Sequence, residues 1–242
     1  MITMNKKIET RIIPEETNPK FYSEHLKPYE LVRGYAGNKN ILEVGCGDGY
    51  GAEYLAKVAK EIVAIDYEED VIKKSQLKYI AKNLKFLCMG ATKLEFPDDV
   101  FDIVCSFQVI EHIPENELLN YLHEIKRVLK PGGRFYVSTL NLAHNMKNPD
   151  TYKKHPAHCK EFFFDELKSL LSKVFFDISV FGLHLTLKHR FFQRLKKIGI
   201  FNFLPDKMNP VKIFYNKVTT ADFLITADNI DKAIDFICIC KK

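Results

Sequence analysis

The 242-residue sequence lacks several features of exported, zinc-clustered and membrane-spanning proteins. It contains no run of about 18 apolar residues, and residues 1–16 carry charges every few positions. The six cysteines include no C-x-x-C pair and are scattered through apolar, strand-like surroundings. We therefore expect a soluble, cytoplasmic protein with reduced thiols, no disulfide, no zinc cluster and no transmembrane segment.

Low-complexity tracts and internal repeats are also absent, and 46% of the residues are hydrophobic. Short apolar runs alternate with amphipathic segments such as 52–59 and 70–81, a rhythm typical of a doubly wound, mostly parallel α/β sheet of the Rossmann-like type. The predicted strands are 40–44, 61–65, 84–87, 101–106 and 134–139, followed by 176–181 and 236–240. We expect a seven-stranded sheet in one domain.

Four segments are expected within this domain. Residues 1–30 contain three prolines among charges and indicate an N-terminal arm or short helices laid over the domain. Residues 31–182 would form the cofactor-binding core, residues 183–230 an insertion or lid, and residues 231–242 the last strand.

The stretch Ile41–Gly51 places glycines 45, 47, 49 and 51 directly behind an apolar strand. Its third glycine comes one position too early for the dinucleotide fingerprint G-x-G-x-x-G, and no Lys-Ser or Lys-Thr follows as in a triphosphate-binding loop. What remains is a loop that lets backbone approach a ligand closely, with Glu43 as an acceptor for a cationic group. A turn that is glycine-rich only for tight packing is the alternative.

The next strand ends in Asp66, whose carboxylate would lie beside the glycine loop. A carboxylate there can accept two hydrogen bonds from a ribose diol. The ligand would then carry a ribose and an amine without needing a phosphate site, unless Asp66 is only a turn residue.

Five segments in order closely resemble the successive motifs of class I S-adenosylmethionine-dependent methyltransferases. They are Glu43 to Gly49, Asp66, residues 94–104, Glu111-His112-Ile113 and residues 129–133. The resemblance covers about residues 20–180 and implies S-adenosyl-L-methionine as cofactor, lying across the carboxyl ends of strands one, two and four. It also implies that the last strand is antiparallel.

One position departs from this family pattern. Gly90 stands where the family often has an acidic residue that binds the adenine amino group. We therefore expect backbone near Ala91 to face the ring, with Tyr67 and Met89 packing on it. The expected cofactor-binding residues are Glu43, Gly45, Cys46, Gly47, Asp66, Tyr67, Gly90, Ala91, Thr92, Phe107 and Gln108.

Methyl transfer to a hydroxyl needs a base near strand four. Gln108, Glu111 and His112, at i, i+3 and i+4, would share a helical face looking into the cleft. Alternatively, Glu111 caps the next helix and His112 is a buried structural histidine.

A second resemblance concerns the segment from His155 to Phe162. It resembles the His-x-x-His-x-x-Glu-Phe segment of methyltransferases that act on glycan precursors, quinone precursors and small-RNA ends. In the RNA enzymes two glutamates and two histidines bind a divalent metal, but here Gln108 replaces the first glutamate, and an amide is a weak ligand for a hard cation. We therefore assign Glu111, His112 and His158 as catalytic and assign no metal ligand.

The positive charge is concentrated in the predicted insertion. Residues 183–217 contain eight Lys or Arg against one acid, whereas the rest of the chain has 28 basic against 30 acidic residues. Leu187, Phe191, Leu195 and Ile198 recur at helical spacing among basic residues, which predicts a basic amphipathic helix. Its basic face is either simply solvated or binds an acidic acceptor, an anionic membrane or RNA.

We thus predict a methyltransferase that modifies oxygen on a small-molecule or glycan-type acceptor. The alternatives are a metal-dependent enzyme acting on RNA 2′-hydroxyls, with nucleic acid the less favoured partner, and a cofactor-binding homologue without activity.

Overall fold

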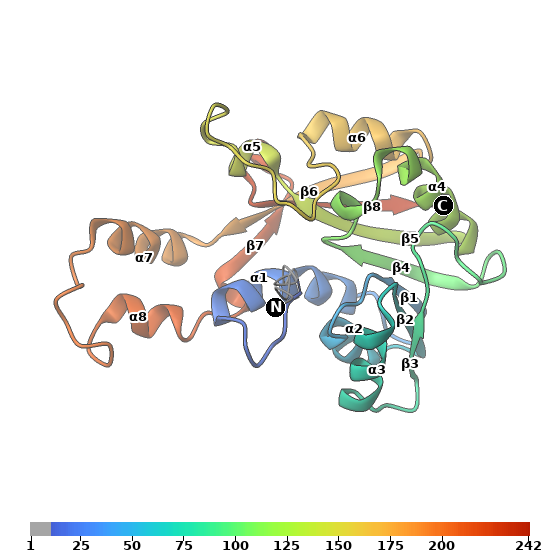
Figure 1. The fold of residues 1–242 in the computed structure, drawn as a ribbon, viewed down its shortest axis with the longest axis horizontal. Coiled ribbons are helices and arrows are strands. Elements are labelled where there is room, and N and C mark those ends of the chain that lie inside the picture. Colours follow the sequence, from blue (N-terminus) through green and yellow to red (C-terminus); the bar gives the residue numbers. More distant parts are fainter. Residues whose placement is uncertain (1–10) are drawn as a thin grey trace, which may run out of the picture.

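The computed structural model describes residues 11–242 as eight strands in one sheet, with strand order β3-β2-β1-β4-β5-β8-β6-β7 (Figure 1). Neighbouring strands among the first five are parallel, and β8, β6 and β7 pair antiparallel with their neighbours. The strands are β1 Asn40–Val44, β2 Glu61–Asp66, β3 Leu84–Cys88, β4 Phe101–Phe107, β5 Leu129–Leu140, β6 Asp177–Leu185, β7 Phe223–Thr226 and β8 Asp235–Lys241.

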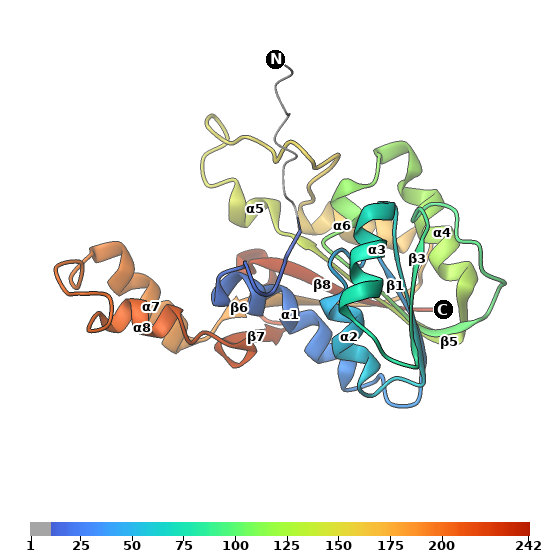
Figure 2. The same cartoon turned by 60° about the horizontal axis from the view of Figure 1, so that its bottom comes forward.

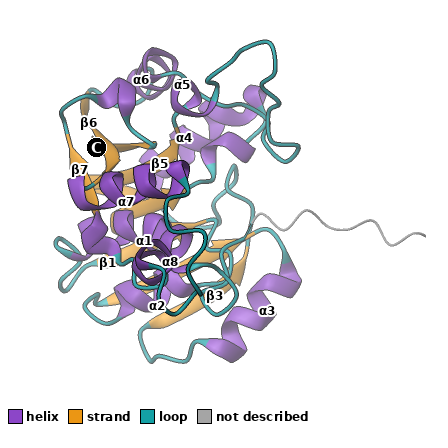
Figure 3. Cartoon of the chain, turned by 90° about the vertical axis from the view of Figure 1, so that its left-hand side faces the viewer, coloured by secondary structure: helices purple, strands orange, loops and turns teal. Residues whose placement is uncertain are grey.

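Helices cover both faces of this sheet (Figures 1 and 3). They are α1 Pro19–Arg33, α2 Tyr50–Ala56, α3 Glu69–Lys78, α4 Leu118–Val128, α5 Leu142–Asn145, α6 Phe164–Ser172, α7 Leu187–Ile198 and α8 Pro210–Tyr215. Short 3₁₀ segments are η1 Ile110–His112, η2 Glu115–Glu117, η3 Thr220–Asp222 and η4 Ile230–Lys232.

Alternation along the strands divides the core between the two faces. In β1, Leu42 and Val44 pack with residues of α4 and α6, whereas Ile41 packs with residues of α1, α2 and α3. Both faces are buried, which is why these strands are continuous apolar runs rather than alternating ones. Because β1 and β4 lie side by side at the centre, their carboxyl ends position the loops of the site.

The sheet confirms the predicted α/β class but has one strand more than the seven expected. The additional strand, β7, lies at the sheet edge and pairs only with β6 among the described elements. It arises inside the predicted insertion, where Phe223 is buried against β6 and Leu224 is exposed. Four residues are too short a run to stand out in the sequence.

Residues 186–222 form a helical hairpin that projects from the sheet (Figures 1 and 2). Its first helix, α7, confirms the helix predicted from the periodicity of 187–198. The ring of Phe192 stacks on Phe214 with centroids 4.2 Å apart, which joins α7 to α8.

The cysteines are all free, and four are buried as expected. Cys88 and Cys159 are exposed, so the expectation of core thiols is wrong for these two. Among the described helices, none is long and apolar enough to cross a membrane.

Candidate active site

The glycine loop follows β1 and turns sharply into α2. The N–H groups of Gly45 and Cys46 both donate to the Ile65 carbonyl of β2, at 2.8 and 2.9 Å, which fixes the loop across the strand ends. Gly47 has φ +52°, and a Cβ added there would meet only the Arg11 side chain, at 3.9 Å. At Gly51 a Cβ would instead lie 2.1 Å from the Tyr29 ring. Gly47 therefore faces open space, whereas Gly51 is required for packing.

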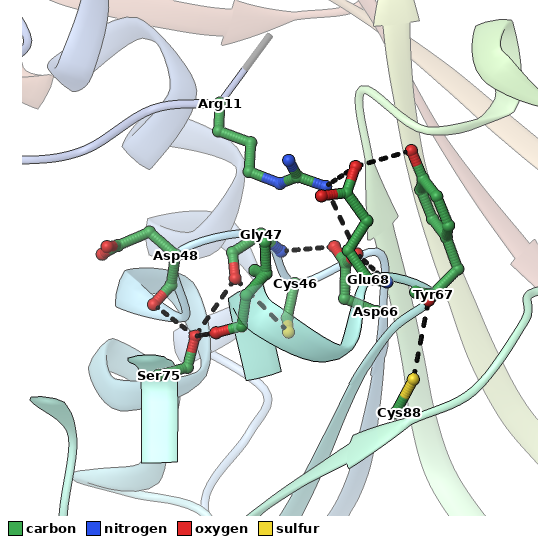
Figure 4. A network of polar contacts seen from close by, with 10 residues as sticks. Arg11, Cys46, Gly47, Asp48, Asp66, Tyr67, Glu68, Ser75 and Cys88 are labelled. Carbon is green, nitrogen blue, oxygen red and sulfur yellow. Dashed lines mark hydrogen bonds and ion pairs between the residues drawn. The ribbon is translucent and has the colours of Figure 1, made fainter. Parts of the chain in front are cut away.

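Asp66, at the end of β2, faces this loop (Figure 4). Its carboxylate accepts hydrogen bonds from the N–H of Gly47 at 3.0 Å and of Glu68 at 3.1 Å. The Arg11 guanidinium lies 3.5 Å from Asp66 Oδ1 and 3.1 Å from Glu68 Oε1 (Figure 4). A buried carboxylate is thus held at the tip of the second strand, as the sequence predicted.

One cavity of about 750 Å³ gathers the residues of the glycine loop, the strand ends and the later histidine loop. It brings together twelve of the fourteen predicted site residues: Gly45, Cys46, Gly47, Asp66, Tyr67, Ala91, Thr92, Phe107, Gln108, Glu111, His112 and His158. None of residues 183–230 lines it. The insertion therefore does not cover this cavity as a lid in the structure.

Glu43 and Gly90 are the two predicted residues that do not line the cavity. Glu43 is 1% exposed and accepts a hydrogen bond of 2.5 Å from the Tyr29 hydroxyl of α1. Burial raises the pKa of Glu43 to about 8. The Glu43 side chain therefore lies on the α1 side of the core, outside the cavity lining, and its role as an acceptor for a cationic ligand stays a prediction. Gly90 is exposed.

The segment after β4 does not form the helical face that was predicted. Gln108 has φ +54°, in the left-handed region, so the helical turn starts only at Ile110. The Gln108 amide donates to Asp235 Oδ2 at 3.2 Å, whereas Glu111 accepts from the Thr139 hydroxyl at 3.0 Å. The side chains reach the same cavity from an irregular turn rather than from one face of a helix.

Glu111 is 1% exposed, and burial raises the pKa of its carboxyl to about 7. Its backbone carbonyl accepts hydrogen bonds from the N–H groups of Cys159 at 2.7 Å and Lys160 at 3.1 Å. Glu111 therefore fixes the loop that carries His158, besides lining the cavity itself.

The two histidines each use Nδ1 to bind protein. His112 Nδ1–H donates to the Ala157 carbonyl at 2.9 Å, and His158 Nδ1–H donates to Glu161 Oε1 at 2.6 Å. These partners select the tautomer whose Nε2 is unprotonated and able to accept a proton. The rings contact edge to face, with centroids 4.9 Å apart.

Glu161 orients His158 and was not among the predicted site residues. It is 7% exposed and also accepts hydrogen bonds from the Tyr152 hydroxyl and from the backbone N–H of His155. Burial opposes ionisation, but the hydrogen bonds from Tyr152 and His158 outweigh it, so the pKa of Glu161 is below its usual value. Its signal in the sequence is the i, i+3 spacing from His158.

Glu24 and Asp235 were also missed. They line the cavity from α1 and β8, at 6% and 8% exposure. Burial, and then the charge of Glu24, raises the pKa of Asp235 well above its usual value. The two residues come from opposite ends of the sequence, so they form no local motif.

Comparison with known proteins agrees with this geometry. A family model described as a methyltransferase domain matches residues 42–137. A probable S-adenosylmethionine-dependent methyltransferase of Mycobacterium tuberculosis is 33% identical over 175 residues, covering 72% of this chain and 62% of the relative. A ubiquinone biosynthesis O-methyltransferase of Hydrogenovibrio crunogenus is 31% identical over 121 residues, covering 49% and 48% of the two chains.

Among solved structures, a SAM-dependent methyltransferase of Thermotoga maritima, described as a possible histamine N-methyltransferase, has the same fold. Its TM-score is 0.61 at 16% identity, with 92% of each chain covered. The family model, the relatives and the shared fold together support a class I S-adenosylmethionine-dependent methyltransferase. It spans a little over three fifths of the length of the Mycobacterium tuberculosis relative, at 62%.

Proposed function

We propose that this protein transfers the methyl group of S-adenosyl-L-methionine to an oxygen atom of a small-molecule or glycan-type acceptor. The observation that carries the proposal is the shared cavity, which is lined both by the glycine loop with Asp66 and by Glu111, His112 and His158. The O-methyltransferase name of the Hydrogenovibrio crunogenus relative supports oxygen as the acceptor atom.

The residues at the strand ends fit the cofactor. The open space at Gly47 would admit a ligand against the backbone, and the Asp66 carboxylate suits a ribose diol. Tyr67 is 72% exposed and would offer its ring to the adenine. When bound, the cofactor supplies a methyl group on a positively charged sulfur, so the chain itself needs to place the acceptor and remove its proton.

His158 is the base in this proposal. Its Nε2 takes the acceptor's hydroxyl proton, and Glu161, bound to Nδ1, stabilises the imidazolium that forms. His112 has a pKa lowered by burial, so it stays neutral and fits an orienting role beside His158.

A metal-assisted mechanism is the second candidate, because Glu111, His112 and His158 can each offer a ligand atom with all three atoms within 4.8 Å of one another. One carboxylate with two imidazoles suits a transition-metal ion better than Mg²⁺. The cation would hold the acceptor oxygen and lower its pKa.

The test combines calorimetric titration of S-adenosylhomocysteine with product formation on a panel of hydroxylated aromatics, sugars and amines. We expect binding of S-adenosylhomocysteine, methylation of a hydroxyl, and loss of about 10²–10⁴-fold in turnover for His158→Ala. Absence of binding would refute the cofactor assignment, and methylation confined to amines would refute oxygen as the acceptor. Turnover that EDTA stops and Mn²⁺ or Zn²⁺ restores would favour the metal-assisted mechanism.

A further inference from the structure

Helix α7 leaves an apolar face in solvent. Leu187, Phe191 and Ile198 are 82%, 57% and 72% exposed, and their spacing puts them on one stripe of the helix. The opposite side of α7 already makes the contacts that hold the hairpin together, through His189, which is 0% exposed, and Phe192, stacked on Phe214. The outer stripe is therefore not needed for packing within the described chain.

Basic residues accompany this stripe. At 100° per residue, Arg194 falls on it and Arg190 and Lys197 lie beside it, and all three are exposed. The single acid of residues 183–217, Asp206, is paired with Lys212 at 2.5 Å. The hairpin thus presents a strongly positive surface with apolar side chains in its middle.

The turn between α7 and α8 continues the apolar character. Ile200, Phe203 and Met208 are 52%, 79% and 66% exposed. This turn lies at the end of the hairpin farthest from the sheet in both views (Figures 1 and 2). The hairpin is therefore free to approach a large flat surface without a collision with the sheet.

We propose that the hairpin docks on the surface of an anionic lipid bilayer through a hairpin surface formed by Leu187, Phe191, Ile198, Ile200, Phe203 and Met208 with Arg190, Arg194 and Lys197. Cationic residues bind the negatively charged headgroups, and the apolar side chains enter the boundary between headgroups and acyl chains. Charge complementarity selects an anionic bilayer over a neutral one.

The apolar side chains also favour a bilayer over RNA. Four of the six are aliphatic Leu, Ile or Met side chains, which have no flat π face on which bases could stack. Exposed aliphatic groups gain little from a phosphate backbone but are buried favourably at the acyl boundary. Membrane docking is independent of the proposed reaction, because no hairpin residue lines the active-site cavity.

The chain has no tryptophan, so a single introduced indole reports on one position. Phe191→Trp is titrated with large unilamellar vesicles of phosphatidylcholine alone or with about 30% phosphatidylglycerol, whose anionic headgroups give the vesicle a negative surface potential. We expect a blue shift and quenching by brominated acyl chains only with the anionic vesicles, weakening as salt is raised. Phe176→Trp is the control, because Phe176 is 92% exposed and precedes β6 at the end opposite α7, so it should show neither change.

A second pair of variants tests the contribution of each part of the surface by vesicle sedimentation. Phe191→Ser with Ile198→Ser should weaken binding at least about tenfold, since two large side chains lose their burial. Arg194→Glu with Lys197→Glu should abolish the preference for anionic vesicles. Unchanged calorimetric binding of S-adenosylhomocysteine shows that the variants are folded.

Three results would overturn the proposal. The first is an emission spectrum of the Phe191→Trp variant that does not shift with anionic vesicles, and the second is equal shifts at both indole positions. The third is tight binding of a single-stranded RNA oligonucleotide together with no vesicle binding, which would assign the surface to nucleic acid.

Discussion

Gly47→Ala and Gly51→Ala add the same methyl group to one loop, and the structure predicts opposite consequences. At Gly51 the new Cβ would lie 2.1 Å from Cε1 and 2.6 Å from the hydroxyl of Tyr29, so the ring must move. Moving it breaks the 2.5 Å hydrogen bond to Glu43, whose carboxyl is buried. Overpacking costs about 1–3 kcal/mol and the unsatisfied carboxyl about 1–3 kcal/mol, partly offset by the better helix propensity of alanine, which is worth about 1 kcal/mol. We expect Gly51→Ala to lower the free energy of unfolding by about 1–5 kcal/mol.

At Gly47 the added Cβ meets only Arg11, at 3.9 Å, and the backbone has φ +52°. Holding alanine in the left-handed backbone region costs about 1–2 kcal/mol in the folded state. Alanine also lowers the conformational entropy of the unfolded chain, which offsets about 0.4–1 kcal/mol of that cost. The free energy of unfolding should therefore fall by about 1 kcal/mol, whereas affinity for S-adenosylhomocysteine should fall at least about tenfold because the methyl group enters the ligand's space.

Urea unfolding followed by circular dichroism measures the stability, and calorimetry measures the affinity. The prediction is refuted if Gly47→Ala destabilises the fold as much as Gly51→Ala, or if it binds S-adenosylhomocysteine with the affinity of the unmodified protein. Gly49 resembles Gly51 rather than Gly47, because a Cβ there would lie 2.7 Å from the Phe86 ring, so substitution should damage the fold itself.

Three further predictions concern ionisable groups. Asp66→Ala should weaken S-adenosylhomocysteine binding by about 1.5–3 kcal/mol in calorimetry, with Asp66→Asn as the control of similar shape; unchanged affinity would remove Asp66 from the site. Glu161→Gln should lower turnover about 10–100-fold, because the imidazolium of His158 loses its negative partner. It should also shift the pH range over which turnover rises with pH, and an unshifted pH–rate profile would contradict a positioning role for Glu161. Glu43→Gln should remove a pH dependence of stability. The folded pKa of about 8 lies above the usual value of 4.5, so this group's contribution is fully present below pH 4.5 and is lost as the pH rises through about 8. The free energy of unfolding is measured with urea at several pH values between 4.5 and 8. If it changes equally with pH in the unmodified protein and in Glu43→Gln, the raised pKa of Glu43 is refuted.

Local patterns predicted the elements that carry strong local signals. Strand β1 has the predicted bounds, and α7 begins and ends where the apolar spacing placed it. In contrast, β5 begins at Leu129, five residues before the predicted start at residue 134. The prediction missed this start because the Pro131-Gly132-Gly133 segment has the composition of a turn. Leu129 pairs with Phe101 and Arg134 with Ile103 of β4, so residues 130–133 form a bulge between two paired positions, with Gly132 at φ +77°.

The site was predictable to the extent that its residues belong to local motifs. Asp66 and the glycine loop are adjacent in any parallel sheet with this strand order, so their meeting followed from topology. Alternation along β1 puts Glu43 on the same face as Ile41, but its hydrogen-bond partner Tyr29 comes from α1, whose docking no spacing in the sequence encodes. Gln108 could not be placed for a similar reason, since its left-handed backbone depends on contacts with Ser138 and Asp235 from other strands.

The position of β8 has a consequence for the order of assembly. Strands β6 and β7 reach the rest of the sheet only through β8, which lies between β5 and β6. Until residues 235–241 have paired with β5, the β6–β7 ribbon and the hairpin it carries have no partner edge, and the edge of β5 is open to other chains. Docking of this strand joins segments that are distant in sequence, which makes it a slow step of folding, and a ribosome-bound chain would complete its sheet only after this strand has emerged.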